Sequence, residues 1–451
     1  MNLHELSTVE VISELRARSF SVVELVQALL ARISELDYLQ AWVHVDPDEV
    51  MAQARRKQTE LDAGSNAPLI GVPTGVKDIF YTAGVPTTAC SKVYADFVPK
   101  YDATTVARLQ EAGGIMLGKT VTTEFAYRDP SPTRNPWNTD HTPGGSSSGS
   151  AAAVAAMMCP TAFGTQTRGS VLRPASYNGI VGLKPTFGRV SRFGVVPLSW
   201  SFDHVGWMAR SVRDVALMLQ VMAGPDKNDP TSLYDDVPDY SVGIRNPDPP
   251  HVGVLQDYFF RNADDDVRTH TQEVVERLSR EGARVEYIEL PESFERAMED
   301  QFTILNVEAA NFHEPLLKEK ADLYGPNIRE LVETGLGIDA VTYSRALESR
   351  LQFIADAEQL SKKAQVLLTP STPTPAPGDL SVTGSAMFQG PWTSTGLPTV
   401  TVPSGLSQSN LPLGIQLIAA RLEEPRLLNA ASWCEQVLGK MPAPPLSLIH
   451  I

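Results

Sequence analysis

The chain has 451 residues, of which 42% are hydrophobic and 20% charged, and its formal net charge is −15. This length provides enough interior for one large domain or two ordinary ones. The acidic balance argues against a surface that binds nucleic acid or an anionic membrane. The three cysteines, Cys90, Cys159 and Cys434, show no CxxC pairing, so we expect no disulfide framework, no zinc site and a cytoplasmic location.

Two S-x-x-E capping boxes near the N-terminus, STVE from Ser7 and SVVE from Ser21, each open an apolar helical pattern. We expect the two helices to pack as a hairpin. A third helix is predicted over about 48–63 and stops at Gly64. Residues 1–64 are therefore predicted to be an N-terminal helical segment rather than a signal peptide.

Residues 65–224 alternate short apolar strands with helices. The stretch PLIGVPTGVKDIF is typical of a strand that ends near Lys77, and DATTVARLQEAGGIMLGKT of a helix, a glycine stop and a buried strand. SAAAVAAMM predicts a helix of small residues. This alternation predicts an α/β fold with a mixed sheet.

The second half of the chain contains another βαβ pattern. HVGVLQ, DDDVRTHTQEVVERLSREG and ARVEYIEL predict this unit within 251–290, and residues 301–364 are predicted to be largely helical. VLLTPS, LPTVTVPSG and LPLGIQLIA predict late strands. We expect 225–365 to form a βαβ and helical cover over a core sheet shared by 65–224 and 366–445. The apolar end LSLIHI supports no inference.

The run GGSSSGS before the Ala-rich helix admits several interpretations. GSSSG satisfies G-x-S-x-G, the nucleophile elbow of α/β-hydrolases, with Ser147 as nucleophile. However, the preceding NPWNTDHTPGG is polar and rich in turns, and the adjacent Asp203 and His204 are poorly placed as an orienting pair. A flexible linker and a helix N-cap are the simpler alternatives. Glycines that lead into an interior helix also bring the backbone close to another group.

Lys77 ends an apolar strand in GVPTGVKDIF. By itself this pattern is typical of a strand-end lysine whose amine reaches water and pairs with Asp78. A lysine amine can also act as a base in a dry pocket, because burial lowers its pKa by several units. A serine hydroxyl is a poor nucleophile until a base takes its proton. Considered together with Ser146 and Ser170, Lys77 is therefore a candidate base.

Several blocks together resemble the amidase signature family: GVPTGVKD, TTACS, DATTVARLQEAGGIMLGKTVTTEFAY, GGSSSGSAAAVAA, GTQTRGSVLRPASYNGIVGLKPTFGRVSRFGVVPLSWSFDHVG, STPTPA and GLPTVTVP with LPLGIQLIA. The resemblance is strong over 65–210 and weaker over 366–420. It implies a mixed central sheet covered by helices on both faces. It also implies a triad in which Ser170 is the nucleophile, Ser146 is a bridging serine after a cis peptide, and Lys77 is the base.

The resemblance further implies an oxyanion hole in the loop GTQTRGSVLRPASYNG. Its donors would be the backbone amides of Thr167, Arg168, Gly169 and Ser170, because developing negative charge needs fixed N–H groups. The absence of a side chain at Gly169 permits the tight turn that aims several N–H groups at one point. A surface β-turn would explain the glycines alone.

Four positions around this loop attract attention. Gln166 and Arg168 depart from the family's common D-x-G-G-S pattern, and Thr393 stands in a block where Asn is common. Gln166 keeps hydrogen bonding but lacks a charge. We expect Arg168 to point away into an ion pair, with binding of a polar acyl group as the alternative. Arg173 either braces the loop or binds a substrate carboxylate, as in some family members.

The resemblance implies an amidase, which hydrolyses a C–N acyl bond in a small amide, aryl amide or carbamate (urethane), and esters more easily, through acyl-Ser170 and water. The alternatives are the A subunit of a tRNA-dependent amidotransferase and a non-catalytic binding protein on the same fold. The expected pocket wall includes Arg173 and the residues Gly145, Phe125, Tyr127, Phe388 and Trp392, although the aromatic residues are also typical of a plain core.

We expect neither a cofactor nor a metal, since the eight histidines, His141 and His204 among them, show no ligand spacing. No stretch approaches the roughly 20 apolar residues that cross a bilayer. The expected partners are therefore a small-molecule substrate and water, with no nucleic acid and no membrane. The chain is expected to act as a monomer or homodimer.

Overall fold

A computed structural model describes residues 2–446, so the last five residues of LSLIHI lie outside the described range. Eleven strands form one mixed sheet in the order β1-β3-β2-β4-β6-β5-β10-β11-β9-β7-β8. β2 runs parallel to β3 and β4, and β7 runs parallel to β8 and β9, while the other pairs are antiparallel. The strands are β1 (Trp42–His44), β2 (Pro73–Lys77), β3 (Ile115–Thr120), β4 (Thr161–Gln166), β5 (Val181–Lys184), β6 (His204–Ala209), β7 (His251–Val254), β8 (Arg284–Tyr287), β9 (Val366–Pro370), β10 (Thr399–Leu406) and β11 (Pro412–Ile418).

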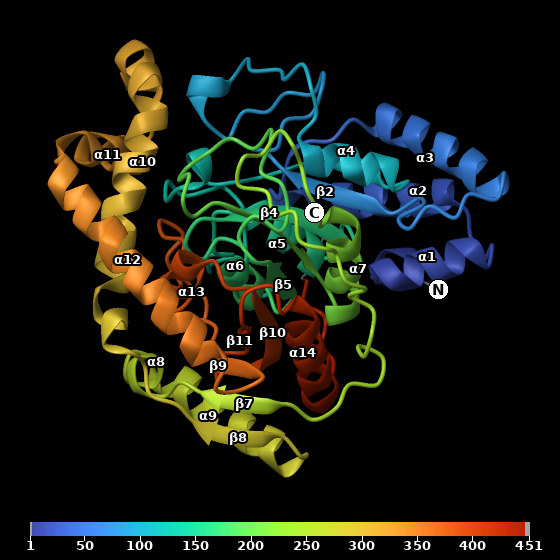
Figure 1. Ribbon diagram of the computed structural model, residues 1–451. Helices are drawn as coiled ribbons and strands as arrows, with labels where there is room; N and C mark the ends of the chain where they lie inside the picture. The colour runs from blue at the N-terminus through green and yellow to red at the C-terminus, as the bar shows by residue number, and fades with distance from the viewer. Residues whose placement is uncertain (1, 447–451) are drawn as a thin grey trace.

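Helices cover both faces of this sheet, as expected (Figure 1). Both α6 and α14 pack on β10, and α5 packs on β4. Because the central strands have helices on either side, β2 to β6 are buried along their whole length. The helices are α1 (Thr8–Arg16), α2 (Val22–Glu35), α3 (Pro47–Asp62), α4 (Thr104–Glu111), α5 (Ser148–Ala155), α6 (Leu172–Tyr177), α7 (Val212–Met222), α8 (Asp257–Arg261), α9 (Asp265–Arg280), α10 (Ala297–Lys320), α11 (Pro326–Gly337), α12 (Ala340–Ser361), α13 (Gly390–Thr395) and α14 (Glu424–Leu438).

The N-terminal helices form where the capping boxes place them. The hydroxyls of Ser7 and Ser21 each accept a hydrogen bond from the backbone N–H three residues later. The side chain of the glutamate at that position in turn accepts a hydrogen bond from the backbone N–H of the serine. The expected hairpin is wrong. α2 packs on α3, whereas α1 contacts α7, and the N–H of Val9 donates to the Asp214 carboxylate at 2.9 Å. The apolar face of α1 is therefore buried against the body of the protein.

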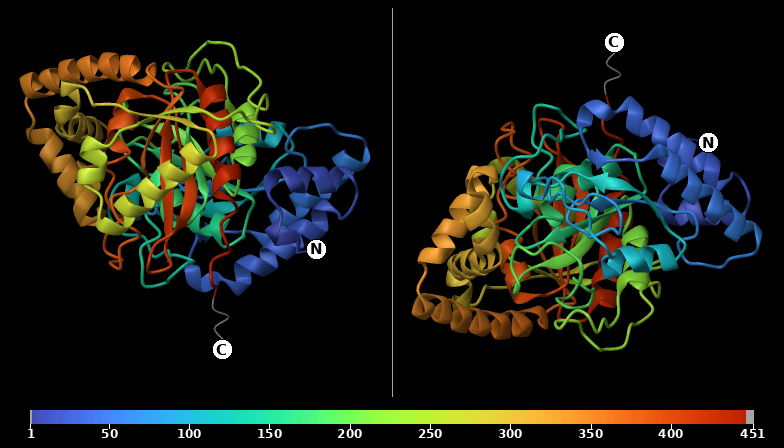
Figure 2. Two further views of the ribbon diagram at one scale, coloured as in Figure 1. Left: turned by 90° about the horizontal axis from the view of Figure 1, so that it is seen from below. Right: turned by 90° about the horizontal axis from the view of Figure 1, so that it is seen from above.

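The βαβ unit within 251–290 extends the sheet, whereas the sequence led us to expect a cover over it. β7 pairs with β9, and β8 continues the sheet beyond β7. Pairing of β7 with β9 satisfies backbone groups that a separate layer would leave at an open edge. Within the predicted cover region, α10, α11 and α12 form a separate helical layer that packs on α13, on the side of the molecule opposite α1 to α3 (Figures 1 and 2).

Candidate active site

The amine of Lys77 lies in the interior at the end of β2. Its Nζ is 2.8 Å from Ser146 Oγ and 2.8 Å from Thr165 Oγ1, and the side chain has no exposed surface. Burial lowers the pKa of Lys77 to about 7, although Asp203 and Cys90 act in the opposite direction. Near neutral pH a large fraction of this amine is therefore uncharged and able to accept a proton. The alternative of an amine that reaches water is wrong.

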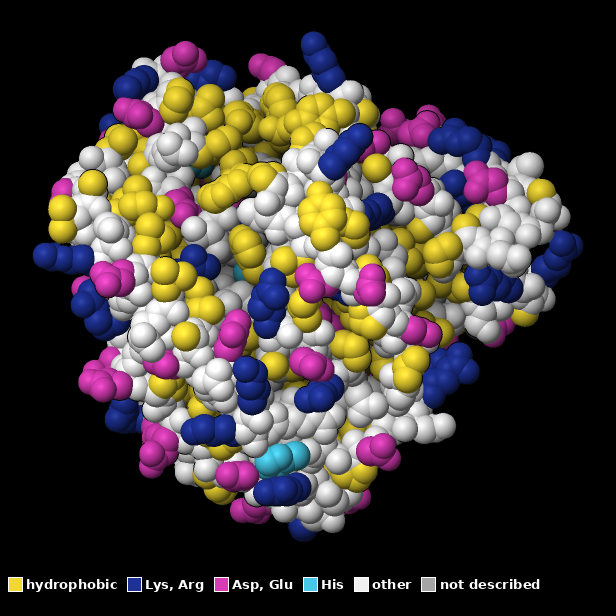
Figure 3. Space-filling view, viewed as in Figure 1, with side chains coloured by type: hydrophobic (Ala, Val, Ile, Leu, Met, Phe, Trp, Pro, Cys, Tyr) yellow, Lys and Arg dark blue, Asp and Glu magenta, His cyan; other side chains and the backbone are white. Residues whose placement is uncertain are grey.

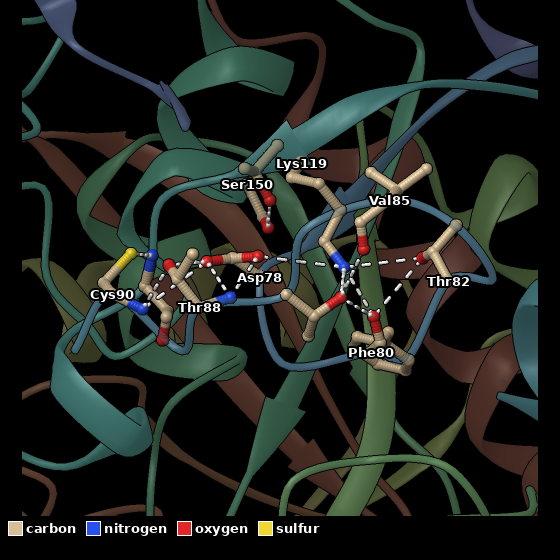
Figure 4. A network of polar contacts seen from close by, with 11 residues as sticks. Asp78, Phe80, Thr82, Val85, Thr88, Cys90, Lys119 and Ser150 are labelled. Atoms are coloured by element: carbon tan, nitrogen blue, oxygen red, sulfur yellow. Dashed lines mark hydrogen bonds and ion pairs between the residues drawn. The ribbon is translucent and has the colours of Figure 1, made fainter. Parts of the chain in front are cut away.

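Asp78 pairs with another lysine (Figure 4). Lys119 Nζ lies 3.8 Å from Asp78 Oδ1, and the hydroxyl of Thr88 donates to Asp78 Oδ2 at 2.5 Å. Both members of the ion pair are fully buried. Burial raises the pKa of Asp78 and lowers that of Lys119 to about 8. Asp78 therefore balances Lys119, which leaves the neighbouring Lys77 free to be neutral.

The GGSSSGS run is an interior turn. The Gly145–Ser146 peptide is cis, and Ser146 is fully buried. The hydroxyl of Ser147 bonds to the carbonyl of Thr165 at 3.4 Å, and it makes no capping bond to α5. The elbow interpretation fails because Ser147 is fully buried against β4, the linker interpretation because residues 144–150 are all buried, and the N-cap interpretation because no side chain caps α5.

The loop 167–170 connects β4 to α6 and carries Ser170, which is 7% exposed. Its four carbonyl groups all accept hydrogen bonds, from Gln301 Nε2 (3.5 Å), Thr393 Oγ1 (2.7 Å), Arg173 N (2.9 Å) and Ser147 N (3.3 Å) in that order. The bond from Ser147 places the two serine turns side by side. Within residues 2–446, the four N–H groups of this loop donate to no protein acceptor. These amides are therefore available to a negatively charged oxygen.

Gln166 organises the same loop from inside. Its Oε1 accepts from the N–H groups of Val171 and Leu172 at 2.9 and 3.0 Å. Its Nε2 donates to Thr393 Oγ1 at 2.9 Å, and that hydroxyl donates to the carbonyl of Arg168. Two of the three departures from the family pattern, Gln166 and Thr393, thus bond to each other and hold the turn.

Arg168 forms no ion pair with any carboxylate of the described chain, so the expected ion pair is wrong. Its Nε donates to Gln301 Oε1 at 3.1 Å, and its guanidinium stacks 3.8 Å from the centroid of the Phe302 ring. Both partners belong to α10. The cover helix therefore supplies an amide and a ring where an ion pair was expected.

The family model described as Amidase matches residues 24–428. The chain belongs to the amidase family. Among curated relatives, the A subunit of the Glutamyl-tRNA(Gln) amidotransferase of Geobacter metallireducens is 36% identical over 97% of this chain and 98% of its own length. The A subunit of the same name from Nitrosococcus oceani is 35% identical over 96% of this chain and 98% of its own length.

Solved structures of amide-hydrolysing enzymes share the whole fold. The peptide amidase of Stenotrophomonas maltophilia has a TM-score of 0.84 and 31% identity, covering 98% of this chain and 99% of its own. A 6-aminohexanoate cyclic dimer hydrolase has a TM-score of 0.88 and 28% identity, covering 99% of this chain and 100% of its own. A chain of a vestigial protein complex, one that reveals the evolutionary origins of an s-triazine catabolic enzyme, has a TM-score of 0.90 and 30% identity, covering 97% of this chain and 100% of its own. The present chain is accordingly an amide-hydrolysing enzyme of this family, not a non-catalytic binding protein.

In this amidase, Arg173 braces the site. Its Nη1 donates to the carbonyl of Gly384 at 2.7 Å, and its Nη2 donates to the carbonyl of Gly145 at 2.5 Å. A side chain at Gly145 would meet Thr383 Cγ2 at 2.8 Å, so the cis turn needs glycine there. Both terminal nitrogens of Arg173 thus donate to backbone carbonyls, which agrees with the bracing role, while its buried Nε has no partner among the described residues.

Three of the four aromatic residues expected at the pocket belong to the interior. Phe388 and Trp392 are fully buried and pack on Phe259, with ring centroids 5.2 and 6.0 Å away. Phe125 is 1% exposed, within a separate aromatic cluster. Only Tyr127 is partly open, with Arg128 over its ring. The plain-core alternative therefore describes three of them.

A cavity of about 190 Å³ approaches the site from the side of β6. Thr165, Thr167, Asp203 and His204 are among its lining residues. Thr167 Oγ1 donates to Asp203 Oδ1 at 2.5 Å, and His204 Nδ1 lies 2.6 Å from the carbonyl of Phe202. No group of side chains within 2–446 could hold a metal ion, and the three cysteines are unpaired.

Two contacts escaped the sequence analysis. Thr165 is a second partner of Lys77, and the only available signal was a polar residue near the end of an apolar strand. Gln301 lies about 130 positions from the loop that it holds, in a helix without any motif, so no local pattern could reveal it.

Among the helices of residues 2–446, none has the length and hydropathy that crossing a bilayer requires.

Proposed function

We propose that this chain hydrolyses the C–N acyl bond of an amide, aryl amide or carbamate (urethane) through a covalent acyl-Ser170 intermediate, and that esters are easier side substrates. The observation that carries this proposal is the buried Lys77 amine, which lies 2.8 Å from Ser146 Oγ and has a pKa of about 7. A base with this pKa needs no histidine to activate a serine.

In the proposed reaction, Ser170 Oγ bonds to the substrate carbonyl carbon while its proton passes to Ser146 and the proton of Ser146 passes to Lys77. The negative charge of the tetrahedral intermediate is held by the amides of residues 167–170, each donor being worth about 2.7–4 kcal/mol in comparable hydrolases. The C–N bond then breaks as Ser146 gives its proton to the leaving nitrogen and Lys77 returns a proton to Ser146. Water, activated by the same route, releases the acyl group from Ser170.

The test combines rates with intact mass. A panel of p-nitroanilides, aryl carbamates and p-nitrophenyl esters is offered to the wild type and to Ser170→Ala, and the enzyme is quenched in the steady state. We expect the wild type to gain the mass of the acyl group on the peptide that contains Ser170, and Ser170→Ala to lose both the adduct and turnover. Equal rates for the two proteins would reject the mechanism.

The second candidate is glutaminase activity within a tRNA-dependent amidotransferase, favoured by the 36% identity to the A subunit of such an enzyme over 97% of the chain. The two candidates differ in substrate and assembly. The purified chain is assayed for ammonia release from L-glutamine beside the anilide panel, and its mass is measured by gel filtration. Turnover of anilides or carbamates by the isolated chain, with little from glutamine, supports the first candidate.

We further infer a stand-alone enzyme, monomeric or homodimeric, that acts in the cytoplasm on a small molecule and needs no nucleic acid. The net charge of −15 and the unpaired cysteines support this inference. On the face shown in Figure 3, acidic and basic side chains are interspersed, without a continuous basic surface. Gel-shift titration with tRNA checks the inference, and saturable binding at physiological salt would contradict it.

A further inference from the structure

Arg168 is a fixed cation beside the nucleophile loop. Gln301 accepts its Nε–H, and Gln301 is itself held because its Nε2 donates to the carbonyl of Gly390 at 2.9 Å. The ring of Phe302 supports one face of the guanidinium. These contacts set the direction of the side chain, yet they use only one of its five N–H groups.

The other end of this guanidinium has no protein partner among residues 2–446. Neither Nη1 nor Nη2 donates a hydrogen bond there, and both keep some access to solvent, in contrast to the buried Nε of Arg173. Its pKa is lowered to about 10, first by burial and next by Arg173, so it remains charged at neutral pH. A largely buried cation without a counter-ion raises the free energy of the folded protein, unless a ligand supplies the opposite charge.

The nearest charges add to this positive field. Arg128 and Arg173 both act on Arg168, while the tyrosines that reach it, Tyr127 and Tyr258, are neutral at pH 7. Arg128 is exposed, stacks over Tyr127 and makes no ion pair within the described residues. The acidic neighbour Asp129 is already engaged, because it accepts from the N–H groups of Asn327 and Ile328 at the start of α11.

We propose that the Nη edge of Arg168 binds a carboxylate of the substrate, so that the enzyme prefers amides or carbamates that carry a negative charge. This inference rests on the proposed function. Arg173 is less suited to this part, because its Nη1 and Nη2 each already donate to a backbone carbonyl, whereas neither terminal nitrogen of Arg168 donates to a protein group of the described chain. The planar edge of a guanidinium matches the two oxygens of a carboxylate, and Arg128 at the rim attracts the same charge.

The experiment uses two matched pairs of probes. The first is N-succinyl-p-nitroanilide and its methyl ester, which place the charge on the acyl part. The second is N-acetyl-4-aminobenzoate and its methyl ester, which place it on the amine part. We measure kcat/KM for amide cleavage with the wild type, Arg168→Gln, Arg168→Lys and Arg128→Gln. The ratio of charged to neutral probe cancels any change that the substitution causes in the backbone amides of the loop.

We expect the wild type to favour the charged member of at least one pair by about 10- to 100-fold, as a charge-assisted hydrogen bond provides. Arg168→Gln reduces this ratio to below about threefold, Arg168→Lys retains part of it, and Arg128→Gln weakens it and its salt dependence. A ratio near one for both pairs in the wild type, or a preference that Arg168→Gln keeps, overturns the inference.

A binding measurement separates this inference from the proposed mechanism. Calorimetric titration of Ser170→Ala with each probe reports recognition without turnover. Tighter binding of the charged probe, lost in Ser170→Ala/Arg168→Gln, supports the carboxylate site whatever the nucleophile is. If Ser170→Ala still cleaves the anilides, the proposed mechanism fails alone. Equal binding of charged and neutral probes overturns the carboxylate site alone.

Discussion

Replacing the hydroxyl of Thr165 with a methyl group tests whether Lys77 is the titrating base. Thr165 Oγ1 lies 2.8 Å from Lys77 Nζ and accepts a hydrogen bond from it. Thr165→Val keeps the volume and the β-branch of this buried strand residue but removes the acceptor. Because Ser146 Oγ remains at 2.8 Å, the variant retains the contact between Ser146 and the amine.

The size of the effect follows from the difference between the two protonation states. A hydrogen bond to a charged group contributes about 1.5–3 kcal/mol and one between neutral groups about 0.5–1.5 kcal/mol. The ammonium form therefore loses about 1–1.5 kcal/mol more than the neutral amine. At 1.36 kcal/mol per pH unit, the apparent pKa of Lys77 falls from about 7 to about 6.

The assay is kcat/KM against pH from 5 to 9 with a neutral anilide. The rate of the wild type should rise through a midpoint near 7 as Lys77 loses its proton, and that of Thr165→Val through a midpoint about one unit lower. The control is Thr161→Val, on the same face of β4, whose hydroxyl bonds to the Met208 carbonyl at 3.0 Å. An unchanged or raised midpoint in Thr165→Val, or an equal shift in Thr161→Val, refutes the reasoning.

The folding equilibrium gives the same assignment an independent check. The pKa of Lys77 is about 7 in the folded chain and 10.5 in the unfolded reference. The penalty for burying its charge is complete below pH 7 and vanishes as the pH rises through 10.5. The free energy of unfolding contributed by this group therefore increases with pH over that window. Lys77→Met, measured by urea unfolding at pH 6 and pH 9, should remove this part of the pH dependence.

Three further substitutions test the surroundings of the proposed triad. Asp78→Asn leaves the buried Lys119 without its counter-charge and should lower the free energy of unfolding by about 3–5 kcal/mol, measured by urea titration at pH 7. Gly169→Ala places a methyl group 2.8 Å from Gln389 Oε1, so the loop must shift; we expect kcat to fall by tenfold or more with KM little changed, and an unaltered kcat would contradict this. Thr393→Val removes the bond to the carbonyl of Arg168 and should lower kcat by about fivefold to tenfold, without a change in the pH midpoint.

The sequence predicted the elements that carry local patterns. The capping boxes of α1 and α2, the strand that ends at Lys77 and the small-residue helix α5 all form where residue type and spacing place them. Local patterns do not state what an element packs against. The βαβ unit was therefore recognised, while its place in the sheet was not, since pairing of β7 with β9 joins residues more than 100 positions apart.

The same limit applies to Arg168, whose residue type suggested an ion pair. The ion pair would require a carboxylate on the facing element, and that element is α10, which presents Gln301 and Phe302 there. A cationic residue in a predicted loop can be recognised from the sequence, but the groups that contact it are decided by the tertiary fold. Its surroundings leave the charge uncompensated by protein groups in the described chain, which is why the side chain points to substrate recognition.

Gln166 and Thr393 show how two separate departures become one feature in three dimensions. An aspartate at 166 could accept from the two N–H groups of Val171 and Leu172, but an ionised carboxylate has no proton to donate. Gln166 donates to Thr393, whose own proton is thereby directed to the carbonyl of Arg168. A carbonyl held in this way fixes the peptide plane and hence the direction of the N–H group of Gly169, one of the proposed oxyanion donors. The geometry of the loop therefore depends on residue 393 as well as on Gly169.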